Sequence, residues 1–239
     1  MSQSDKAAAV PSSRLARLAR LGSLASGVAG GMLAEGVRQW SRGNRPSVGD
    51  LLLTPGNAQR VADQLSRLRG AAMKVGQLLS MDAGDLMPPE LAAILARLRA
   101  DAQPMPMSQL VPVLEAAWGA GWDRHFERFS FTPLAAASIG QVHAAQLKSG
   151  ERLAIKVLYP GVRQSIASDV DNVATLLRVS GLLPRTLDFA PLLEEAKRQL
   201  HDEADYLKEA AYLEAYRGRL ADHGDFALPT VHRALTTPD

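Results

Sequence analysis

The segment RFSFTPLAAASIGQVHAAQLKSGERLAIKVLYPG, residues 128–161, constrains the fold more than any other part of the chain. It contains short stretches in which polar and apolar residues alternate, and a Lys-Ser-Gly-Glu turn joins two of them. Alternation with a period of two is typical of β-strands, and strands joined by a short polar turn pair antiparallel. The segment therefore predicts a small antiparallel sheet, a three-stranded meander.

Helical patterns precede and follow this sheet. Before it, apolar residues recur at steps of three and four, as one face of a helix requires; they are Val61, Leu65, Leu68, Ala72, Val75 and Leu79. Further helices are expected over residues 15–40, 91–100, 109–118, 163–182 and 191–220. The order of helices, sheet and helices indicates an α+β fold. We expect a disordered N-terminal segment at 1–13, an N-terminal helical extension at 14–125 and a domain containing the sheet at 126–239.

Composition excludes several classes of function. The chain has 27 basic and 25 acidic residues and no basic run interleaved with aromatic residues, so no nucleic-acid partner is expected. It has no cysteine, which excludes a disulfide framework, a thiolate metal site and a cysteine nucleophile. The histidines show no metal-ligand spacing, and we expect His143, in the second strand, to be structural. No metal site is predicted within this chain.

The N-terminal segment combines the basic stretch SSRLARLARLG with the small and apolar stretch LGSLASGVAGGMLAEGV. The apolar run ends at Glu35, short of the ~20 residues of a transmembrane helix, and it is too polar for a signal peptide. Gly27 and Gly31 form a small-xxx-small pair that serves either packing within the fold or contact with a membrane or a second copy in a homodimer. We expect a cytoplasmic bacterial protein, peripheral to the inner membrane, rather than a mitochondrial one, because Asp5 is unusual in a transit segment.

Lys156 lies between apolar neighbours in RLAIKVL, on the strand face opposite Ile155 and Val157. Such a lysine is either an edge residue that deters aggregation or a cation paired with a carboxylate. Upstream lies the loop AAASIG, residues 135–140, where a nucleotide-binding loop would usually be rich in glycine. A loop that covers phosphates, followed by a strand whose lysine reaches them, is the arrangement of a kinase N-lobe.

A carboxylate partner for Lys156 would come from the helix expected over 191–220. Asp205 and Glu209 lie one turn apart on one side of this helix, and Glu203 lies apart from both. Each is either part of a solvated face or, for Glu209, a partner of the sheet. The second alternative requires the helix to be covered on both sides, because its predicted apolar stripe lies opposite, on Leu200, Ala204, Leu207 and Ala211.

The helical stretch RLRGAAMKVGQLLSMD, residues 67–82, is a second unusual segment. Lys74 and Gln77, at i and i+3, project together from one side of the helix. Gly76 costs about 1 kcal/mol relative to alanine inside a helix, which indicates close approach of another backbone or of a ligand. The alternative is a solvent-facing pair beside a packing glycine.

Four motifs in one order, KVGQ, AAASIGQVH, AIKV and EADYLKEA, resemble the UbiB family of atypical protein-kinase-like proteins. This family includes mitochondrial and bacterial members linked to coenzyme Q biosynthesis. The segments YPGVRQSIASDVDN and VPSSRLARLARLGSLASGVAGGMLAE are also similar to the family, so the resemblance covers nearly the whole chain. It implies a kinase-like N-lobe at 126–239, with a small antiparallel sheet and a long helix of the αC type, preceded by a helical extension.

The resemblance assigns roles to individual residues. Lys74, Gly76 and Gln77 are similar to the family's Lys-x-Gly-Gln motif, on an extension that folds over the N-lobe and closes the usual entrance for protein substrates. Lys156 matches the lysine that contacts nucleotide phosphates, and Glu209 matches the glutamate that pairs with it. These last two are the implied catalytic residues.

The resemblance also defines a loop and a second motif. Glu203 and Asp205 match the family's Glu-x-Asp motif, which interacts with the Lys-x-Gly-Gln segment. Alanines in place of glycines restrict the backbone, and the implied effects are altered nucleotide selectivity and suppressed kinase-type transfer. The implied nucleotide loop consists of Ala135, Ala136, Ala137, Ser138, Ile139 and Gly140.

The resemblance implies an ATPase or kinase-like enzyme that binds ATP or ADP and supports ubiquinone biosynthesis or isoprenoid-lipid handling. Its implied partners are adenine nucleotide, isoprenoid lipid, the membrane surface and quinone-biosynthesis enzymes. A kinase-like fold takes its Mg²⁺ ligands from a C-lobe, whose catalytic-loop and Asp-Phe-Gly motifs are not found before Asp239. We therefore expect the N-terminal part of a longer protein, with little or no phosphoryl transfer of its own.

Two alternatives stay open. One is a non-catalytic module that docks on a membrane or on biosynthetic enzymes and keeps a degenerate nucleotide pocket. The other is an ordinary small-molecule or protein kinase. The lack of a Gly-x-Gly-x-x-Gly loop and the presence of KVGQ argue against that second alternative.

Overall fold

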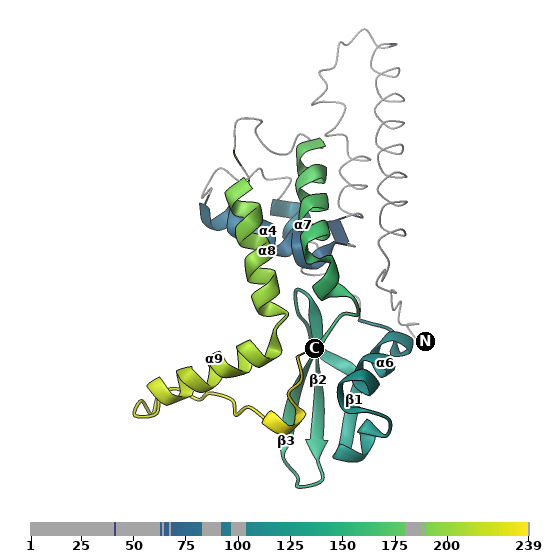
Figure 1. Cartoon of the computed structure of the whole chain (residues 1–239), viewed down its shortest axis with the longest axis vertical. Helices are drawn as coiled ribbons and strands as arrows, with labels where there is room; N and C mark the ends of the chain where they lie inside the picture. Colours follow the sequence, from purple (N-terminus) through teal and green to yellow (C-terminus); the bar gives the residue numbers. More distant parts are fainter. Residues whose placement is uncertain are drawn as a thin grey trace. The chain divides into compact units, whose positions relative to one another are not determined.

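A computed structural model describes the chain at residues 41, 63, 65–66, 68–82, 92–96, 104–179, 188 and 190–238 (Figure 1). The predictions for residues 1–40, including the contact through Gly27 and Gly31, lie outside these ranges. The chain divides into two compact units, which we call the sheet unit and the helical unit. Of the described residues, 104–163 and 198–238 belong to the sheet unit, and the others belong to the helical unit.

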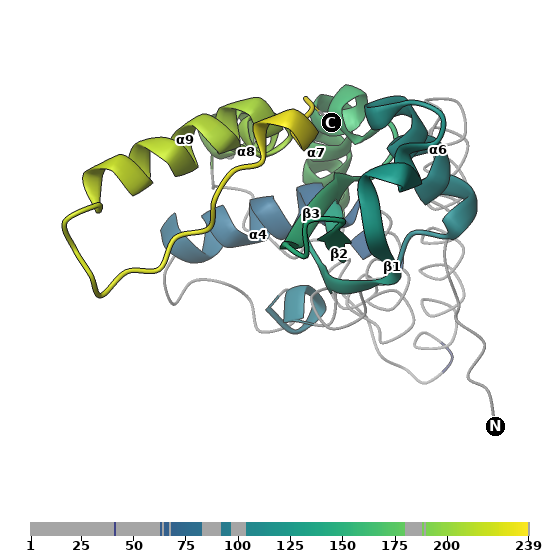
Figure 2. The ribbon, with the colours of Figure 1, turned by 90° about the horizontal axis from the view of Figure 1, so that it is seen from below.

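The sheet unit is built on a three-stranded antiparallel sheet in the order β1-β2-β3 (Figure 2). The meander predicted from the alternating segment is confirmed, and with the helices described below it gives the α+β arrangement of a kinase-like N-lobe. β1 contains a bulge between Phe129 and Pro133. Phe129 pairs with Ala145 and Pro133 pairs with His143, so β1 has extra residues between these two pairs. The strands are β1 (Phe126–Ala136), β2 (Gly140–Leu147) and β3 (Arg152–Leu158).

The core of the sheet unit lies between the sheet and helix α6 (Met107–Trp118), which the short helix η2 (Trp122–His125) follows. Leu153 and Ile155 of β3 pack against this core, as the alternation predicts. Burial of apolar surface from both elements therefore fixes which face of the sheet is turned inward. The buried members of the core are Met105, Leu110, Leu114, Trp122, Phe126, Ala145 and Val157.

The helical pattern over 191–220 is interrupted, so the prediction of a continuous helix is wrong. The structure contains α8 (Ala190–Glu203) and α9 (Tyr206–Arg219) in its place. Asp205, with φ −102° and ψ 91°, is extended, and its carboxylate accepts a hydrogen bond from the backbone N–H of Lys208. An aspartate in this position is an N-cap. It starts a new helix where helix propensity alone would continue the old one.

The interruption changes which face of the second helix is buried. Leu200 on α8 and Ala204 directly after it are buried, but Leu207 is 42% exposed and Ala211 is exposed as well. Tyr206 and Ala210 are buried instead. The buried face is therefore rotated by one residue, about 100° around the helix axis. Because of this rotation, Glu209 reaches the sheet without the helix having to be covered on both sides.

After α9 the chain turns and runs back beside that helix toward the sheet (Figures 1 and 2). An ion pair between Arg233 and Glu214 joins the returning segment to α9. The indole Nε1 of Trp118 donates to the carbonyl of Leu235 at 2.9 Å. The short helix η3 (Arg233–Leu235) is therefore anchored both to α9 and to the core of the sheet unit.

The helical unit contains α4 (Arg69–Asp82), a helical stretch at 92–96, and most of α7 (Val162–Val179) together with the start of α8. Lys197 Nζ lies 2.8 Å from Asp171 Oδ1 and 2.9 Å from Glu194 Oε1. These hydrogen bonds, chiefly the one to Asp171, raise the pKa of Lys197. The predicted apolar stripe before the sheet is confirmed by the burial of Leu65, Ala72, Val75 and Leu79, while Val61 lies outside the described residues.

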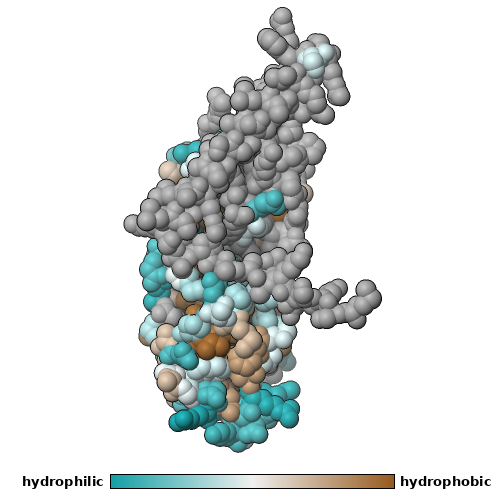
Figure 3. Space-filling model, turned by 90° about the vertical axis from the view of Figure 1, so that its right-hand side faces the viewer, coloured by the Kyte–Doolittle hydropathy of each residue, from teal (hydrophilic) through white to brown (hydrophobic). Residues whose placement is uncertain are grey.

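Some large apolar side chains of the sheet unit are exposed, among them Met107, Phe131 and Leu134. On the face shown in Figure 3, apolar residues reach the surface in patches between hydrophilic ones. Phe131 and Leu134 lie where the pairing of β1 with β2 is irregular. None of the helices among the described residues is long and apolar enough to cross a membrane.

Candidate functional site

The loop between β1 and β2 is shorter than the sequence predicts. Ala135 and Ala136 belong to β1 and pair with residues of β2, so only residues 137–139 connect the two strands. The backbone N–H of Ala137 donates to the carbonyl of Gly140 at 2.9 Å and closes the turn. The predicted alanine loop is therefore a tight hairpin connection preceded by two strand residues.

Two contacts hold this hairpin connection in place. Ile139 is buried, and its carbonyl accepts a hydrogen bond from the backbone N–H of Tyr159 at 3.0 Å. Ser138 Oγ donates to Glu203 Oε2 at 2.9 Å. The connection is thus joined to the segment after β3 and to the last residue of α8. Other elements of the sheet unit set its position before any ligand binds.

Gly140 has a steric reason to be glycine. A Cβ at this position would lie 2.3 Å from the carbonyl oxygen of Val157 and 3.3 Å from the Cα of Leu158. These are backbone atoms of the neighbouring strand, and they cannot move aside as the end of a flexible side chain can. Close approach of β2 and β3 therefore requires glycine here, whether or not a phosphate also approaches.

Lys156 is paired, which decides between its two predicted environments. Its Nζ lies 2.7 Å from Oε2 and 3.0 Å from Oε1 of Glu209, and 5.0 Å from the ring centroid of Tyr206. The side chains of Lys156 and Glu209 are 33% and 49% exposed, so solvent screens the pair. We expect the pair to stabilise the fold by at most about 1 kcal/mol. Its main effect is geometric, because it fixes an ammonium group that an anion can still reach.

Glu203 and Asp205, the two acids of the Glu-x-Asp motif, have different partners within the sheet unit. Glu203 holds Ser138 of the hairpin connection, and Asp205 caps the N-terminus of α9. The family resemblance implies that both acids contact the Lys-x-Gly-Gln segment. That segment belongs to the helical unit, and the contact stays a prediction.

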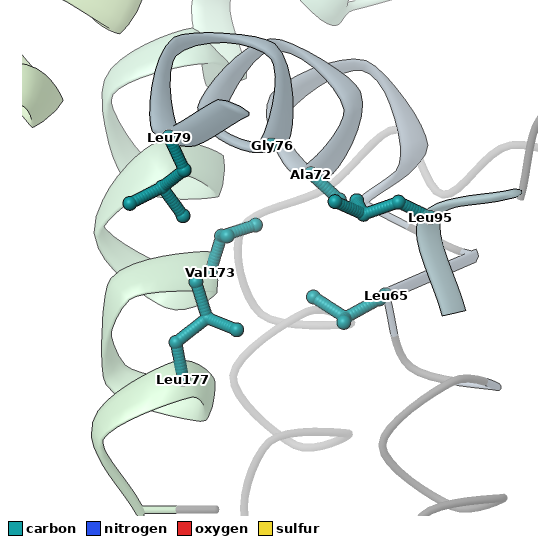
Figure 4. A pocket seen from close by; sticks show the side chains of 7 residues that line it. All are labelled: Leu65, Ala72, Gly76, Leu79, Leu95, Val173 and Leu177. Carbon is teal, nitrogen blue, oxygen red and sulfur yellow. The ribbon is translucent and has the colours of Figure 1, made fainter. Parts of the chain in front are cut away.

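Lys74, Gly76 and Gln77 lie on α4, where Gln77 is exposed and Lys74 is half-buried. Gly76 faces the side chain of Leu95, and a Cβ on Gly76 would come within 2.4 Å of Leu95 Cδ1 (Figure 4). A side chain, rather than the expected backbone or ligand, therefore accounts for this glycine. The cavity beside it has a volume of about 10 Å³, the size of a single water molecule. Its apolar lining consists of Leu65, Ala72, Gly76, Leu79, Leu95, Val173 and Leu177.

His143 is a buried structural residue in a chain of hydrogen bonds. The backbone N–H of Met105 donates to Gln141 Oε1 at 2.9 Å, so the amide nitrogen of Gln141 faces His143 Nε2 at 2.8 Å. His143 Nδ1 then donates to the carbonyl of Ser130 at 2.8 Å. The imidazole stacks on Phe129. Burial lowers the pKa of His143, although the bond to Ser130 opposes the shift.

Sequence reasoning missed two residues that organise this part of the molecule. Gln141 is buried on the same strand face as His143 and Ala145. The period of two along β2 could have identified it as an inward-facing residue. Arg163 donates to the backbone carbonyls of Ala204 and Pro238. Nothing in the local sequence indicates those two distant partners.

The donor groups of the site suit an anion. Lys156 supplies an ammonium group close to the hairpin connection, whose Ser138 hydroxyl already donates to Glu203. Among the residues that the structure describes, no group of three or more His, Cys, Asp or Glu side chains could hold a metal ion. The described residues therefore supply no ligand set for a resident divalent cation.

These features define a class of protein. Lys156 lies on the third strand opposite Val142, just after the hairpin connection, and it pairs with Glu209 on a helix. A strand lysine paired with a helix glutamate, next to a loop between the first two strands, is the N-lobe of a protein-kinase-like fold.

Residues 97–239 match the ABC1 atypical kinase-like domain. The chain therefore belongs to the ABC1, or UbiB, family of atypical kinases, as its motifs predict. It is 41% identical to the atypical kinase COQ8, mitochondrial, of Saccharomyces cerevisiae, over 97% of this chain and 46% of that protein. It is 34% identical to the probable protein kinase UbiB of Pseudomonas putida, over 70% of this chain and 31% of that protein.

A similar solved structure is the complex of Rv3197 with erythromycin from Mycobacterium tuberculosis. It is 34% identical to this chain, with a TM-score of 0.45, and the match covers 76% of this chain and 47% of the other. The chain thus spans less than half the length of each of these three similar proteins.

Proposed function

We propose that this chain is the N-lobe part of an atypical kinase or ATPase that binds adenine nucleotide and supports ubiquinone biosynthesis. The observation that carries the proposal is the pair of Lys156 and Glu209 on β3 and α9, in a site whose hairpin connection is already held in place. The COQ8 and UbiB relatives support the link to quinone biosynthesis.

An adenine nucleotide would place its phosphates between residues 137–139 and Lys156. The ammonium group would form charge-assisted hydrogen bonds with phosphate oxygens, and Glu209 would keep it directed toward them. The Cβ of Ala137 removes backbone freedom that glycine would have, so the connection holds fewer poses over the phosphates. Mg²⁺ bound with the nucleotide would neutralise charge on the phosphates, and its protein ligands are expected from the C-lobe of the longer protein.

The substrate side of the proposal follows from the chemistry of quinone synthesis. Isoprenoid quinone intermediates are apolar and reside in membranes. We therefore expect the whole protein to act at the cytoplasmic surface of an inner membrane, on isoprenoid lipids or on the enzymes that modify them. Nucleotide hydrolysis would be coupled to the handling of these lipids.

Thermal unfolding with ATP or ADP, each with and without Mg²⁺, tests nucleotide binding. The measurement is made on this chain and on one extended by the C-terminal region that its longer relatives have. Nucleotide at a hundredfold excess over Kd stabilises the folded state by about 2.7 kcal/mol, which corresponds to a rise in Tm of about 2–3 °C for a chain roughly twice this length. We expect this rise in the extended chain and its loss in Lys156→Met.

Lys148→Met, which removes an exposed lysine from the β2–β3 turn, is the matched control and should keep the rise in Tm. An extended chain whose Tm responds to no nucleotide would rule out the ATPase proposal. It would favour the non-catalytic docking module instead.

Ala136→Gly tests the role of the alanines. Ala136 is an exposed residue at the end of β1, and glycine there would loosen the approach to the hairpin connection. We expect the ratio of ATP to ADP affinity to change severalfold, or autophosphorylation to appear in the extended chain. Ala116→Gly makes the same change at an exposed position of α6 and should do neither. If Ala136→Gly behaves like the unaltered protein in both assays, the alanines are merely tolerated.

A further inference from the structure

The junction between α8 and α9 is held by a residue outside both helices. The Nη2 of Arg163, in the first turn of α7, donates to the carbonyl of Ala204 and, at 2.7 Å, to that of Pro238. The backbone N–H of Tyr206 also donates to the carbonyl of Pro238, at 3.4 Å. One guanidinium group therefore joins the end of α8 to the C-terminal segment that leads back from α9.

The junction matters because acids on both of its sides contact the sheet. Glu203, at the end of α8, holds Ser138, and Glu209, on α9, holds Lys156. In an uninterrupted helix, at about 100° per residue, positions 203 and 209 would point roughly 120° apart. Both can reach the sheet at once because the chain changes direction between the two helices.

Asp205 accounts for only part of this geometry. Its N-cap sets the residue at which α9 begins, but a cap does not set the direction of the new helix relative to the sheet. A contact from outside the helices must do that. Arg163 makes such a contact. Its positive charge lies at the C-terminal end of α8, where it also interacts favourably with the helix dipole.

Arg163 is itself fixed relative to the site. It follows β3 after a short turn in which the backbone N–H of Val162 donates to the carbonyl of Tyr159 at 3.2 Å. Tyr159 in turn donates to the carbonyl of Ile139 in the hairpin connection. The backbone thus links Arg163 directly to the loop and to the strand that carries Lys156.

We propose that Arg163 is a positioning residue of the nucleotide site: it holds the α8–α9 junction in the direction that brings Glu209 to Lys156. The proposal rests on the proposed function, in which Lys156 of the Lys156–Glu209 pair binds the nucleotide phosphates. The positioning itself is a property of the folded chain without ligand. An arginine that only stabilised the fold would affect all elements of the sheet unit alike.

Acylation of lysine amines by dilute acetic anhydride, measured for each lysine by mass spectrometry, tests the proposal. Pairing with a carboxylate slows this reaction because the amine must first leave its hydrogen bonds to Glu209. In this chain Glu209→Gln should raise the acylation rate of Lys156 by about two- to fivefold, the range for a partly exposed ion pair. We expect Arg163→Met to raise it by a similar factor and leave the exposed Lys148 unchanged.

Two further variants separate positioning from general stability. Arg178→Met removes an exposed arginine from the last turn of α7 and should leave Lys156 at its original rate. Arg163→Lys keeps the charge but lacks the planar fork of donors, so we expect an intermediate rate at Lys156. Partial rescue by lysine, with the Tm and the rate at Lys148 unchanged, would support positioning.

Several outcomes would overturn the proposal. One is an unchanged Lys156 rate in Arg163→Met when Glu209→Gln raises it; another is an unchanged rate in Glu209→Gln itself. If Arg163→Met unfolds, so that all lysines react faster together, Arg163→Lys decides: a rise confined to Lys156 supports the proposal, and no such rise refutes it. All rates are measured without nucleotide, so they do not depend on whether the titrations find binding.

Discussion

Replacing Gly140 with alanine is expected to lower the free energy of unfolding by about 3 kcal/mol, the upper part of the range for overpacking. The added Cβ would lie 2.3 Å from the carbonyl oxygen of Val157 and 3.1 Å from its carbonyl carbon. Val157 is buried in the core of the sheet unit, and its strand is paired with β2 along its length. Relief of the contact therefore requires the two strands to separate at the start of β2.

Urea denaturation of this chain measures the effect, and two other glycines serve as controls. Gly218 lies on α9, and a Cβ added there would point into open space, so Gly218→Ala should stabilise the chain by up to about 1 kcal/mol. At Gly76 the added Cβ would meet the flexible end of Leu95, and the loss should be smaller than at Gly140. A Gly140→Ala variant within about 0.5 kcal/mol of the unaltered chain would contradict the steric explanation.

The same contact affects how variants of the loop are interpreted. A glycine in this position would usually be assigned to the approach of a phosphate. Here the neighbouring strand already excludes a side chain, so lost nucleotide binding in Gly140→Ala would report damage to the sheet. Ser138→Ala is the more informative change, because it removes one hydroxyl and its bond to Glu203 without adding an atom.

The sheet could be predicted because its signals are local. Alternation in β3 sets Ile155 and Val157 toward the core and Lys156 away from it, and the structure keeps that arrangement. The ends of β1 could not be predicted in the same way. Ala135 and Ala136 have little strand propensity, and they are in a strand because β2 pairs with them.

The division of the last helical segment depends on contacts distant in the sequence. The residues around Asp205 are mostly good helix formers, and Lys208 stands where a capping box would have a glutamate or glutamine. The local pattern therefore continues through the junction. The helix is interrupted by contacts that include the hydrogen bond from Arg163 to the carbonyl of Ala204. The periodicity of neither segment reveals this bond. The pairing of Glu209 with Lys156 depends on the same junction.

Gln141→Leu should be nearly as destabilising as Gly140→Ala, for a different reason. Gln141 and His143 are fully buried and Met105 nearly so, and the Gln141 amide accepts from Met105 N–H while donating to His143 Nε2. Leucine has a similar shape but cannot form either bond. Each buried group that it leaves without a partner costs about 1–3 kcal/mol. We therefore expect a loss of about 3 kcal/mol in the free energy of unfolding.

A double-mutant cycle with His143→Phe identifies the source of that loss. If the bond between the two side chains carries part of it, Gln141→Leu should cost less in the His143→Phe background, by about 0.5 kcal/mol or more. Gln146→Leu is the matched control: it lies on the same strand, and its side chain donates to the carbonyl of Gly150 in the exposed turn, so a change within about 0.5 kcal/mol is expected. Equal losses for Gln141→Leu and Gln146→Leu would contradict the network. The buried amide would then fill space without tying the segment before α6 to the strand that follows the hairpin connection.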